Sequence, residues 1–269
     1  LTLANNNLLE TINKKAKALG VAAKVHIKID TGMGRIGFWH QDKAHLFVEK
    51  AASSKFIDVE GLYTHFAAAA RDKVYTAYQM ESFEKLITQL LNMGIDIPYR
   101  HAANSIATVN LKRTHLNLVR PGLIIYGMYP KKGFQRFINL KPALSLKTRI
   151  AYLKKVPPGR SISYGRTYVT QNHTRIATIP IGYADGYGRI LSNKAEVLIR
   201  GKKAPVIGKV TMDQTMVNVG HIKDVTIGDE VVLIGRQGQN EITAENLARL
   251  AGTIPYEIVC SITDRVPRR

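Results

Sequence analysis

The chain has 269 residues, enough for one large domain or two domains of ordinary size. Its hydrophobic fraction of 45% and charged fraction of 22% are typical of a soluble globular protein, and no apolar run approaches the roughly 18 residues of a membrane helix. The net charge of +19 attracts polyanions in general. However, the basic residues are scattered and lack any zinc-finger or RNA-binding pattern, so we expect no specific nucleic-acid partner and no metal.

The single cysteine, Cys260, excludes a disulfide within the chain and favours a reduced, cytoplasmic compartment. It lies in the apolar run Tyr256–Ile262, where we expect a buried thiol. The sequence begins at Leu1 without an initiating methionine and shows no secretory leader. We therefore expect a processed or partial cytoplasmic chain.

The first half of the sequence alternates strand-like and helix-like segments. Residues Lys24–Asp30 alternate in side-chain polarity, which indicates a strand. Residues Asp72–Met93 have helical spacing, and Gly94 is the expected cap. We expect one side of this helix to hold Tyr78, Phe83, Ile87 and Leu91. Further strand candidates are Phe56–Tyr63, Tyr99–Ala103 and Leu116–Arg120, with a helix opening at Asn104–Ser105. Strands separated by helices predict parallel βαβ units.

The second half changes character after about Gly133, where short strands follow turns rich in Gly and Pro. The predicted strands are Ala143–Lys154, Thr174–Ile181, Ala195–Ile199, Ala204–Val210, Met216–Val219 and Glu230–Ile234. Only Ala244–Ala251 has a clear helical pattern, with Thr243 as its N-cap. We expect two domains: an α/β domain over residues 1–138 and a mostly antiparallel β domain over residues 139–269.

Polar residues follow the predicted strands of the first half. The four segments are Asp30–Arg35, Thr64–His65, Asn104–Ser105 and Arg120–Leu123. Active sites of (β/α) barrels lie at the carboxyl ends of the strands, and the last loops often bind phosphate. The Ser105 hydroxyl and a backbone made accessible by Gly122 suit an anion. This pattern predicts a phosphate-binding barrel site.

Eight motifs, in order along the chain, resemble those of bacterial alanine racemases. They are Lys28–Gly37, Leu62–Phe66, His101–Ser105, Val119–Gly127, Ser163–Tyr168, Ile181–Gly186, Met212–Gln214 and Tyr256–Cys260. The resemblance implies a fold type III enzyme that uses pyridoxal 5'-phosphate (PLP) to interconvert L-alanine and D-alanine for peptidoglycan synthesis. It also implies that residues 1–138 are the C-terminal half of a PLP-binding (β/α)8 TIM barrel, followed by the β domain.

The resemblance assigns cofactor contacts to five residues. Arg120 matches the arginine that donates to the pyridine nitrogen of PLP, and an arginine does not readily release its proton, so that nitrogen stays unprotonated. A less electron-poor ring limits side reactions of a carbanion. The residues that match the phosphate ligands are Ser105, Gly122, Leu123 and Tyr256.

The resemblance also implies two catalytic bases. Tyr164 matches the base on one face of the substrate's α-carbon, and a lysine that holds the cofactor is the other. A free tyrosine has a pKa near 10, so Tyr164 needs assistance to accept a proton. His65 and Arg120 match the relay that provides it.

Substrate contacts come from both halves of the sequence. Arg35 resembles the residue that binds the alanine carboxylate, for which a guanidinium fork is well suited. Lys28 matches a lysine that is carbamylated in many family members and then orients Arg35; unmodified, it is an ordinary strand lysine. Tyr183 and Met212 match entrance residues that the partner subunit supplies, which implies a homodimer with composite active sites. Asp213, beside them, is either structural or faces the substrate.

Two departures from the family pattern affect these expectations. Thr211 stands where many relatives have cysteine, which predicts a modest change of pocket shape. The family's PLP lysine lies in a Lys-Ala-Asp-Ala-Tyr-Gly-like segment, and only Ala184–Tyr187 has a superficial similarity to it, without the lysine. A whole barrel takes about 250 residues. We therefore expect that the N-terminal segment with the PLP lysine is missing, that the barrel is partial, and that the chain alone is inactive.

Two alternatives stay open at this point. A related racemase that acts on serine or on several amino acids would differ mainly in its pocket residues. An inactive remnant, or a basic partner-binding protein, would not need a catalytic set, and the intact tyrosine, arginine and histidine positions argue against it.

Overall fold

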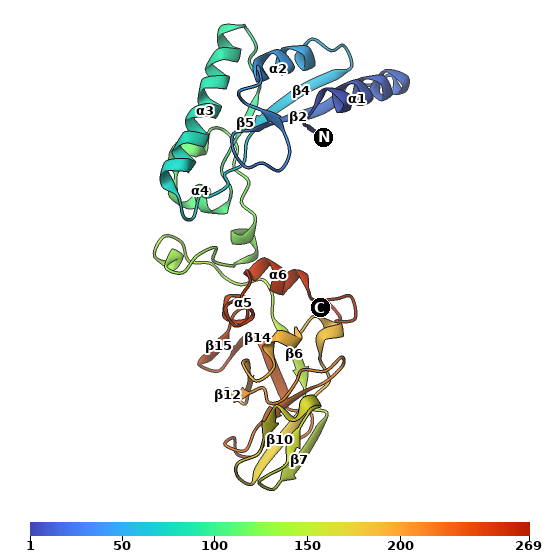
Figure 1. Ribbon diagram of the computed structural model, residues 1–269, viewed down its shortest axis with the longest axis vertical. Coiled ribbons are helices and arrows are strands. Elements are labelled where there is room, and N and C mark those ends of the chain that lie inside the picture. The colour runs from blue at the N-terminus through green and yellow to red at the C-terminus, as the bar shows by residue number, and fades with distance from the viewer. The chain divides into compact units, whose positions relative to one another are not determined.

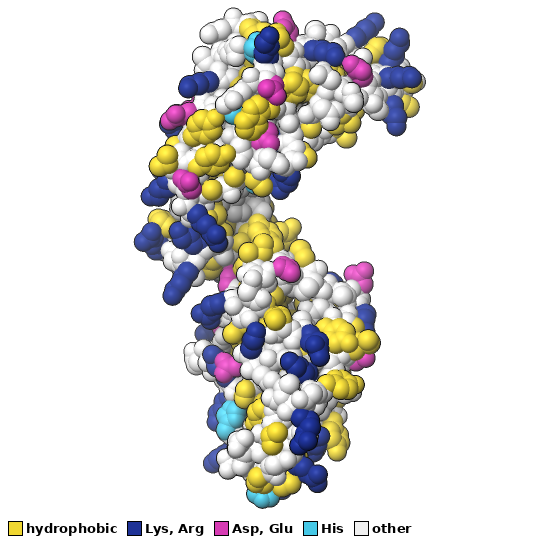
Figure 2. Space-filling view, in the orientation of Figure 1, with side chains coloured by type: hydrophobic (Ala, Val, Ile, Leu, Met, Phe, Trp, Pro, Cys, Tyr) yellow, Lys and Arg dark blue, Asp and Glu magenta, His cyan; other side chains and the backbone are white.

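A computed structural model describes residues 1–269 and divides them into two compact units (Figure 1). Unit 1 comprises residues 1–125 and 130–139, and unit 2 comprises residues 126–129 and 140–269. No helix in either unit combines the length and the apolar character needed to cross a membrane. On the face shown in Figure 2, Lys and Arg side chains are spread over both units rather than gathered in one patch.

Unit 1 is built on a parallel sheet with the strand order β1-β2-β4-β5, and β3 pairs with the end of β2. The strands are β1 (Thr2–Leu3), β2 (Ala23–Asp30), β3 (Phe38–Trp39), β4 (Ile57–Tyr63) and β5 (Tyr99–His101). Three helices connect these strands, α1 (Asn6–Leu19), α2 (Ala44–Ala52) and α3 (Lys73–Asn92), and α4 (Ser105–Asn110) follows β5. Short 3₁₀ turns η1 (Lys112–Thr114), η2 (Leu123–Tyr126) and η3 (Phe134–Arg136) follow. The predicted alternation of parallel strands and helices is thus present.

Local signals define the helix ends in unit 1. The Asp72 carboxylate accepts the Tyr75 N–H at 2.8 Å and so caps α3. Asn104 accepts the N–H groups of Ile106 and Ala107, both at 3.1 Å, and caps α4 in the same way. This second cap fixes the start of the polar segment Asn104–Ser105, a short distance after the end of β5.

The four residues predicted on one side of α3 do not share one face. Phe83 and Ile87 are buried, but Tyr78 and Leu91 are 42% and 43% exposed. The buried positions of the helix are Thr76, Gln79, Met80, Phe83, Leu86, Ile87 and Leu90. At about 100° per residue, Tyr78 and Leu91 lie roughly 140° and 80° around the helix from Phe83, so neither lies at the centre of the buried face.

The predicted strand Leu116–Arg120 does not form. Only Leu118 makes a bridge, to His101, and Leu116 has a left-handed φ of 50° that breaks an extended run. The Asn117 side chain accepts the Arg100 N–H at 2.7 Å and donates to the Pro98 carbonyl at 2.6 Å. The Asn117 side chain therefore replaces part of the backbone pairing, whereas the Arg120 N–H still donates to the Ala103 carbonyl at 3.0 Å.

Unit 2 consists of antiparallel sheets, in agreement with the expected β domain. The strand orders are β13-β10-β7, β12-β11-β14-β15 with β6 also on β14, and β8-β9. The strands are β6 (Leu146–Arg149), β7 (Tyr152–Val156), β8 (Ser161–Ile162), β9 (Tyr168–Val169), β10 (Thr174–Ile179), β11 (Glu196–Ile199), β12 (Lys202–Pro205), β13 (Thr215–Asn218), β14 (Glu230–Gln237) and β15 (Asn240–Ile242). Side chains of both larger sheets share one buried core.

Two predicted strands of unit 2 are wrong in their limits. The segment 143–154 is divided, because β6 pairs with β14 whereas β7 pairs with β10. The Ile150 N–H donates to Asp229 at 3.0 Å and the Ala151 N–H to Thr178 at 2.9 Å, so the chain changes sheets at this point. The segment 204–210 instead ends as β12 at Pro205, because Val206 forms a bridge with Val217 of β13 and the Ile207 N–H donates to the Met216 carbonyl at 2.9 Å.

The end of the chain holds two helices, α5 (Ala244–Ala251) and α6 (Pro255–Cys260). The Thr243 cap of α5 agrees with the prediction. Helix α6 was not predicted, although Pro255 at its first turn is a known start signal. Cys260 is exposed, which contradicts the expected buried thiol, because the last turn of α6 leaves it at the surface.

Candidate active site

Arg120 is the centre of a polar cluster at the carboxyl end of the parallel sheet in unit 1. Its guanidinium donates to the Thr64 carbonyl at 2.7 Å and to the Ala102 carbonyl at 3.3 Å. It also contacts Nδ1 of His101 and, at 3.4 Å, Nδ1 of His65. An arginine can only donate hydrogen bonds, so both histidine nitrogens must accept. The guanidinium is therefore held in one orientation and stays charged.

His101 and His26 form a second layer behind Arg120 that the sequence did not predict. His101 Nε2 lies 2.7 Å from His26 Nδ1, and the Tyr63 ring stacks on His101 with 4.8 Å between ring centroids. Burial, then the charge of Arg120 and then His26, lower the pKa of His101 to about 3. His101 opens one of the family motifs, but its pairing with His26 depends on strand register and has no local signature.

His65 follows β4 and is half-buried. Burial, followed by the charges of Arg120, Arg35 and Lys28, lowers its pKa to about 4. With Nδ1 accepting from Arg120, the neutral ring carries its proton on Nε2. Gln79 of α3, fully buried, donates to the His65 carbonyl at 3.2 Å and accepts the Ala67 N–H at 2.9 Å. This glutamine positions the His65 segment and was also missed by sequence reasoning.

Lys28 lies near the end of β2 and is only 2% exposed. Its Nζ donates to the Ile29 carbonyl at 2.7 Å. Burial is the largest cause of a pKa lowered to about 8; Asp30 opposes the shift, and the charges of Arg120 and Arg35 add to it. At neutral pH this amine is therefore neutral far more often than an exposed lysine.

Asp30 shapes the loop that carries Arg35. Its carboxylate accepts the N–H groups of Gly32, Met33 and Gly34 at distances of 2.8–3.2 Å. Burial alone would raise the pKa of Asp30, but these backbone donors and Lys28 hold it below its ordinary value. Arg35 itself is exposed at the top of this loop, and its charge contributes to the shifts of Lys28 and His65.

The predicted phosphate ligands Ser105 and Gly122 are brought together. Ser105, 6% exposed, accepts the Gly122 N–H at 2.8 Å through its Oγ and keeps its own proton to donate. Leu123 follows directly at the start of η2 and is buried. Tyr256 belongs to α6 of unit 2 and is 40% exposed.

The remaining predicted residues lie in unit 2 and are exposed. Tyr164, in the turn η4 (Tyr164–Arg166), is 71% exposed. Tyr183, in the turn η5 (Tyr183–Asp185), is brought next to Met212, because the Tyr183 N–H donates to Thr211 at 3.0 Å and the Ala184 N–H to Met212 at 3.0 Å. A Cβ on Gly182 would lie 2.2 Å from the Thr211 carbonyl oxygen, so only glycine permits this approach.

The sequence was compared with known families, and it matches two family models in the same order. Residues 1–130 match the alanine racemase N-terminal domain, and residues 143–269 match the alanine racemase C-terminal domain. An alanine racemase of Halothermothrix orenii is 51% identical over 268 residues, which are 99% of this chain and 70% of that protein. This chain belongs to the alanine racemase family.

Solved structures of alanine racemases agree with this assignment. One from Clostridium difficile superposes with a TM-score of 0.93 at 41% identity and covers 98% of this chain and 69% of that chain. Another, from Bacillus anthracis with bound L-Ala-P, gives a TM-score of 0.89 at 40% identity and covers 100% of this chain and 69% of that chain. The alanine racemase fold, with a barrel-like domain and a β domain, is thus established, and the family depends on PLP.

One expectation from the sequence is not supported. The model of the N-terminal domain matches residues 1–130, so the expectation of a missing N-terminal segment with the PLP lysine finds no support. The expectation that the chain is inactive depended on that absence, and the named relatives do not bear it out.

Proposed function

We propose that this chain interconverts L-alanine and D-alanine with PLP, and that Tyr164 is one of two bases. The observation that carries the proposal is the fixed guanidinium of Arg120, which is half-buried and donates to carbonyl and imidazole acceptors at the carboxyl end of the sheet. A permanently charged donor there suits an aromatic ring nitrogen that must stay unprotonated.

The donor set of unit 1 fits PLP. Arg120 would hold the ring nitrogen, and the Ser105 hydroxyl with the backbone of Gly122 and Leu123 would hold the phosphate. Tyr256 completes the proposed phosphate ligands from unit 2. When bound, PLP supplies an electron sink that makes the α-proton of an amino acid acidic.

Tyr164 removes or returns that proton on one face of the α-carbon. Its hydroxyl is ordinarily too weak a base at neutral pH, so a hydrogen-bonded neighbour must stabilise the phenolate. Neutral His65, with its proton on Nε2 and Arg120 on Nδ1, is the donor we infer for this purpose. A lysine that holds the cofactor acts on the opposite face.

We further propose that Lys28 is carbamylated and orients Arg35. The neutral amine attacks carbon dioxide, an N–C bond forms, and one proton is released to give an anionic carbamate. The lowered pKa of Lys28 favours the neutral amine that this step requires. The cations of Arg120 and Arg35 near Lys28 would stabilise the product. Arg35, held in place, then binds the substrate carboxylate.

The exposure of Tyr164, Tyr183 and Met212 supports composite sites in a homodimer. We infer that the Arg120 cluster of one copy functions with these three residues from its partner. Mixed dimers of Arg35→Ala and Tyr164→Phe test the idea, because one site of each mixed dimer then carries no substitution. Random reassortment should restore about a quarter of the wild-type rate, whereas no recovery would contradict shared sites.

We also interpret the sheet β1-β2-β4-β5, with helices between its parallel strands, as the C-terminal half of a (β/α)8 barrel. The clustering of polar residues at the carboxyl strand ends supports this interpretation. Unit 2 is the β domain that accompanies it.

The proposed activity is tested by incubating the purified protein and PLP with L-alanine and measuring D-alanine with a D-amino-acid oxidase assay. L-Serine is the parallel substrate. We expect alanine to be converted faster than serine. Absence of D-alanine with PLP bound would overturn the proposal. Faster conversion of serine would identify serine, rather than alanine, as the substrate.

A further inference from the structure

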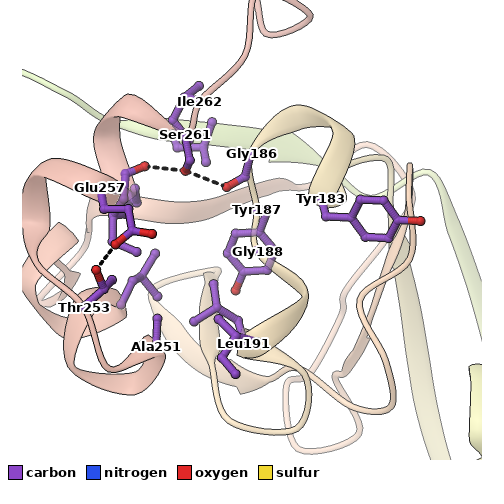
Figure 3. Close-up of a pocket in the computed structure, with 15 residues that line it drawn as sticks. Tyr183, Gly186, Tyr187, Gly188, Leu191, Ala251, Thr253, Glu257, Ser261 and Ile262 are labelled. Carbon is purple, nitrogen blue, oxygen red and sulfur yellow. Dashed lines mark hydrogen bonds between the residues drawn. The ribbon is translucent and has the colours of Figure 1, made fainter.

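The turn that carries Tyr183 is not supported by close packing on one side. A cavity of about 320 Å³ lies against it, between the segment 183–191 and residues of α5, α6 and the chain that follows them. Figure 3 shows Tyr187 and Leu191 on one wall of this cavity, and Thr253 and Glu257 on another. The Tyr183 ring is directed away from the other lining residues. Ile181 and Tyr187 on either side of the turn belong to the buried core, and polar contacts hold the turn in addition.

Arg265 makes two ion pairs that connect the turn to the Met212 loop. Its Nε lies 3.3 Å from Asp185 Oδ1, and its Nη2 lies 2.7 Å from Asp213 Oδ1. The second oxygen of Asp185 accepts the Gly182 N–H at 2.9 Å. One guanidinium thus joins the residues that follow Tyr183 to the residue that follows Met212.

The chain before Arg265 strengthens the same connection. The Thr263 hydroxyl donates to the Ala184 carbonyl at 2.9 Å, and the Thr263 N–H donates to the Asp185 carbonyl at 3.2 Å. Ser261 donates to the Gly186 carbonyl at 3.0 Å, as Figure 3 shows. These contacts bring Arg265 to the turn, where its planar fork can reach two carboxylates at once.

We propose that Arg265 is a positioning residue that fixes Tyr183 and Met212 relative to each other for binding of the amino-acid substrate. The inference rests on the proposed function, which assigns both residues to the substrate entrance. Asp213, whose role the sequence left open, is structural in this scheme. Because the Arg265 side chain is half exposed, its loss should loosen this one region and leave the global stability of the protein nearly unchanged.

The test compares Arg265→Gln and Arg265→Lys with the control Arg200→Gln. Arg200 pairs with Asp229 in the same unit, and the exposures of that pair, 43% and 17%, resemble the 52% and 12% of Arg265 and Asp185. Hydrogen–deuterium exchange of residues 182–187 should be roughly three- to tenfold faster in Arg265→Gln, the size expected for loss of a networked ion pair. The control should leave this peptide unchanged. Lysine, which reaches one carboxylate at a time, should give an intermediate rate.

Steady-state kinetics with PLP-loaded protein provide the second measurement. We expect a higher KM for alanine in Arg265→Gln, a smaller change of kcat, and wild-type values for Arg200→Gln. Unchanged exchange in both Arg265 variants, an unchanged KM, or an equal effect of Arg200→Gln would each overturn the proposal. If the wild-type protein forms no D-alanine, the proposed function fails, and the exchange measurement still decides whether Arg265 holds the turn.

Discussion

The ring of His26 reaches His101 across the intervening strand β4, and their facing nitrogens are 2.7 Å apart. Gly61 of β4 makes this contact possible, because a Cβ there would lie 2.2 Å from His26 Nδ1. Since Arg120 donates to His101 Nδ1, the proton of neutral His101 is on Nε2 and is donated to His26. Arg120 thus donates to His101, and His101 donates to His26, so both hydrogen bonds run in the same direction.

Substitution Gly61→Ala should expel the His26 ring and break this chain. Overpacking of this kind costs typically 1–3 kcal/mol, and we expect a lower midpoint of urea unfolding together with weaker PLP binding. Gly188→Ala is the control, because its nearest neighbour would be an ordinary contact at 3.7 Å. An unchanged midpoint for Gly61→Ala would show that the sheet adapts without losing the contact.

Tyr164→Phe should lower the rate roughly 10²–10⁴-fold in the direction in which this tyrosine removes the proton. PLP should still bind, because its proposed ligands lie elsewhere, and absorbance of the bound cofactor measures this. The control is Tyr152→Phe, which removes the hydroxyl of another exposed tyrosine of unit 2. Near-normal rates in both directions would exclude Tyr164 from the mechanism.

Acid should destabilise the protein through two histidines that stay neutral in the folded state. The pKa values of His65 and His101 are lowered from an ordinary 6.5 to about 4 and about 3, respectively. Between pH 6.5 and about pH 3, histidines of the unfolded chain bind protons that the same residues do not bind in the folded protein. The free energy of unfolding therefore falls as the pH drops below about 6.5. Urea unfolding at pH 7 and pH 4.5 measures the decrease.

The variant His101→Gln should lose part of this pH dependence, since glutamine does not titrate. His173→Gln, at an exposed position, should retain the wild-type dependence. If His101→Gln and the wild type lose equal stability between the two pH values, His101 is not a source of the acid sensitivity.

Lys28 should form a carbamate rather than a Schiff base. Carbon-13-labelled bicarbonate should give a carbamate NMR signal that grows from pH 7 to pH 9, because the neutral fraction of an amine with a pKa of about 8 increases there. Lys28→Arg should abolish the signal, raise the KM for alanine and leave PLP binding intact. Lys24→Arg is the control on the same strand; Glu60 raises the pKa of Lys24.

Borohydride reduction of the protein with PLP, followed by peptide mapping, checks the same assignment. The buried Nζ of Lys28 donates to the Ile29 carbonyl, and we expect no cofactor label on this residue. A label on Lys28 would contradict both the carbamate and the orienting role toward Arg35.

The sequence predicted those elements whose signals are local. The strand at Lys24–Asp30, the helix that opens at Asn104–Ser105 and the cap at Thr243 each depend on neighbours within one element, and all three are present. The grouping on α3 was wrong because Tyr78 and Leu91 lie roughly 140° and 80° around the helix from Phe83, so the four residues do not share one side. The strand at 116–120 failed because the side chain of Asn117 satisfies backbone groups that strand pairing would otherwise satisfy.

Only those site residues that belong to a family motif could be predicted from the sequence. Arg120, His65 and Ser105 each belong to such a motif. The pairing of His26 with His101 requires the register of three strands and a glycine in the middle one, and Gln79 contacts His65 from a helix 14 residues further along the chain. Contacts of this kind arise from tertiary structure and have no pattern in the sequence.

The change of sheets at Ile150 and Ala151 has a consequence for how unit 2 unfolds. Strands β6 and β7 are separated by only these two residues, and each belongs to a different sheet. Because no further residues separate β6 from β7, local unfolding of one sheet displaces a strand of the other. Unit 2 should lose both sheets in one cooperative transition, and a shared midpoint for probes placed in β10 and β11 would be its signature.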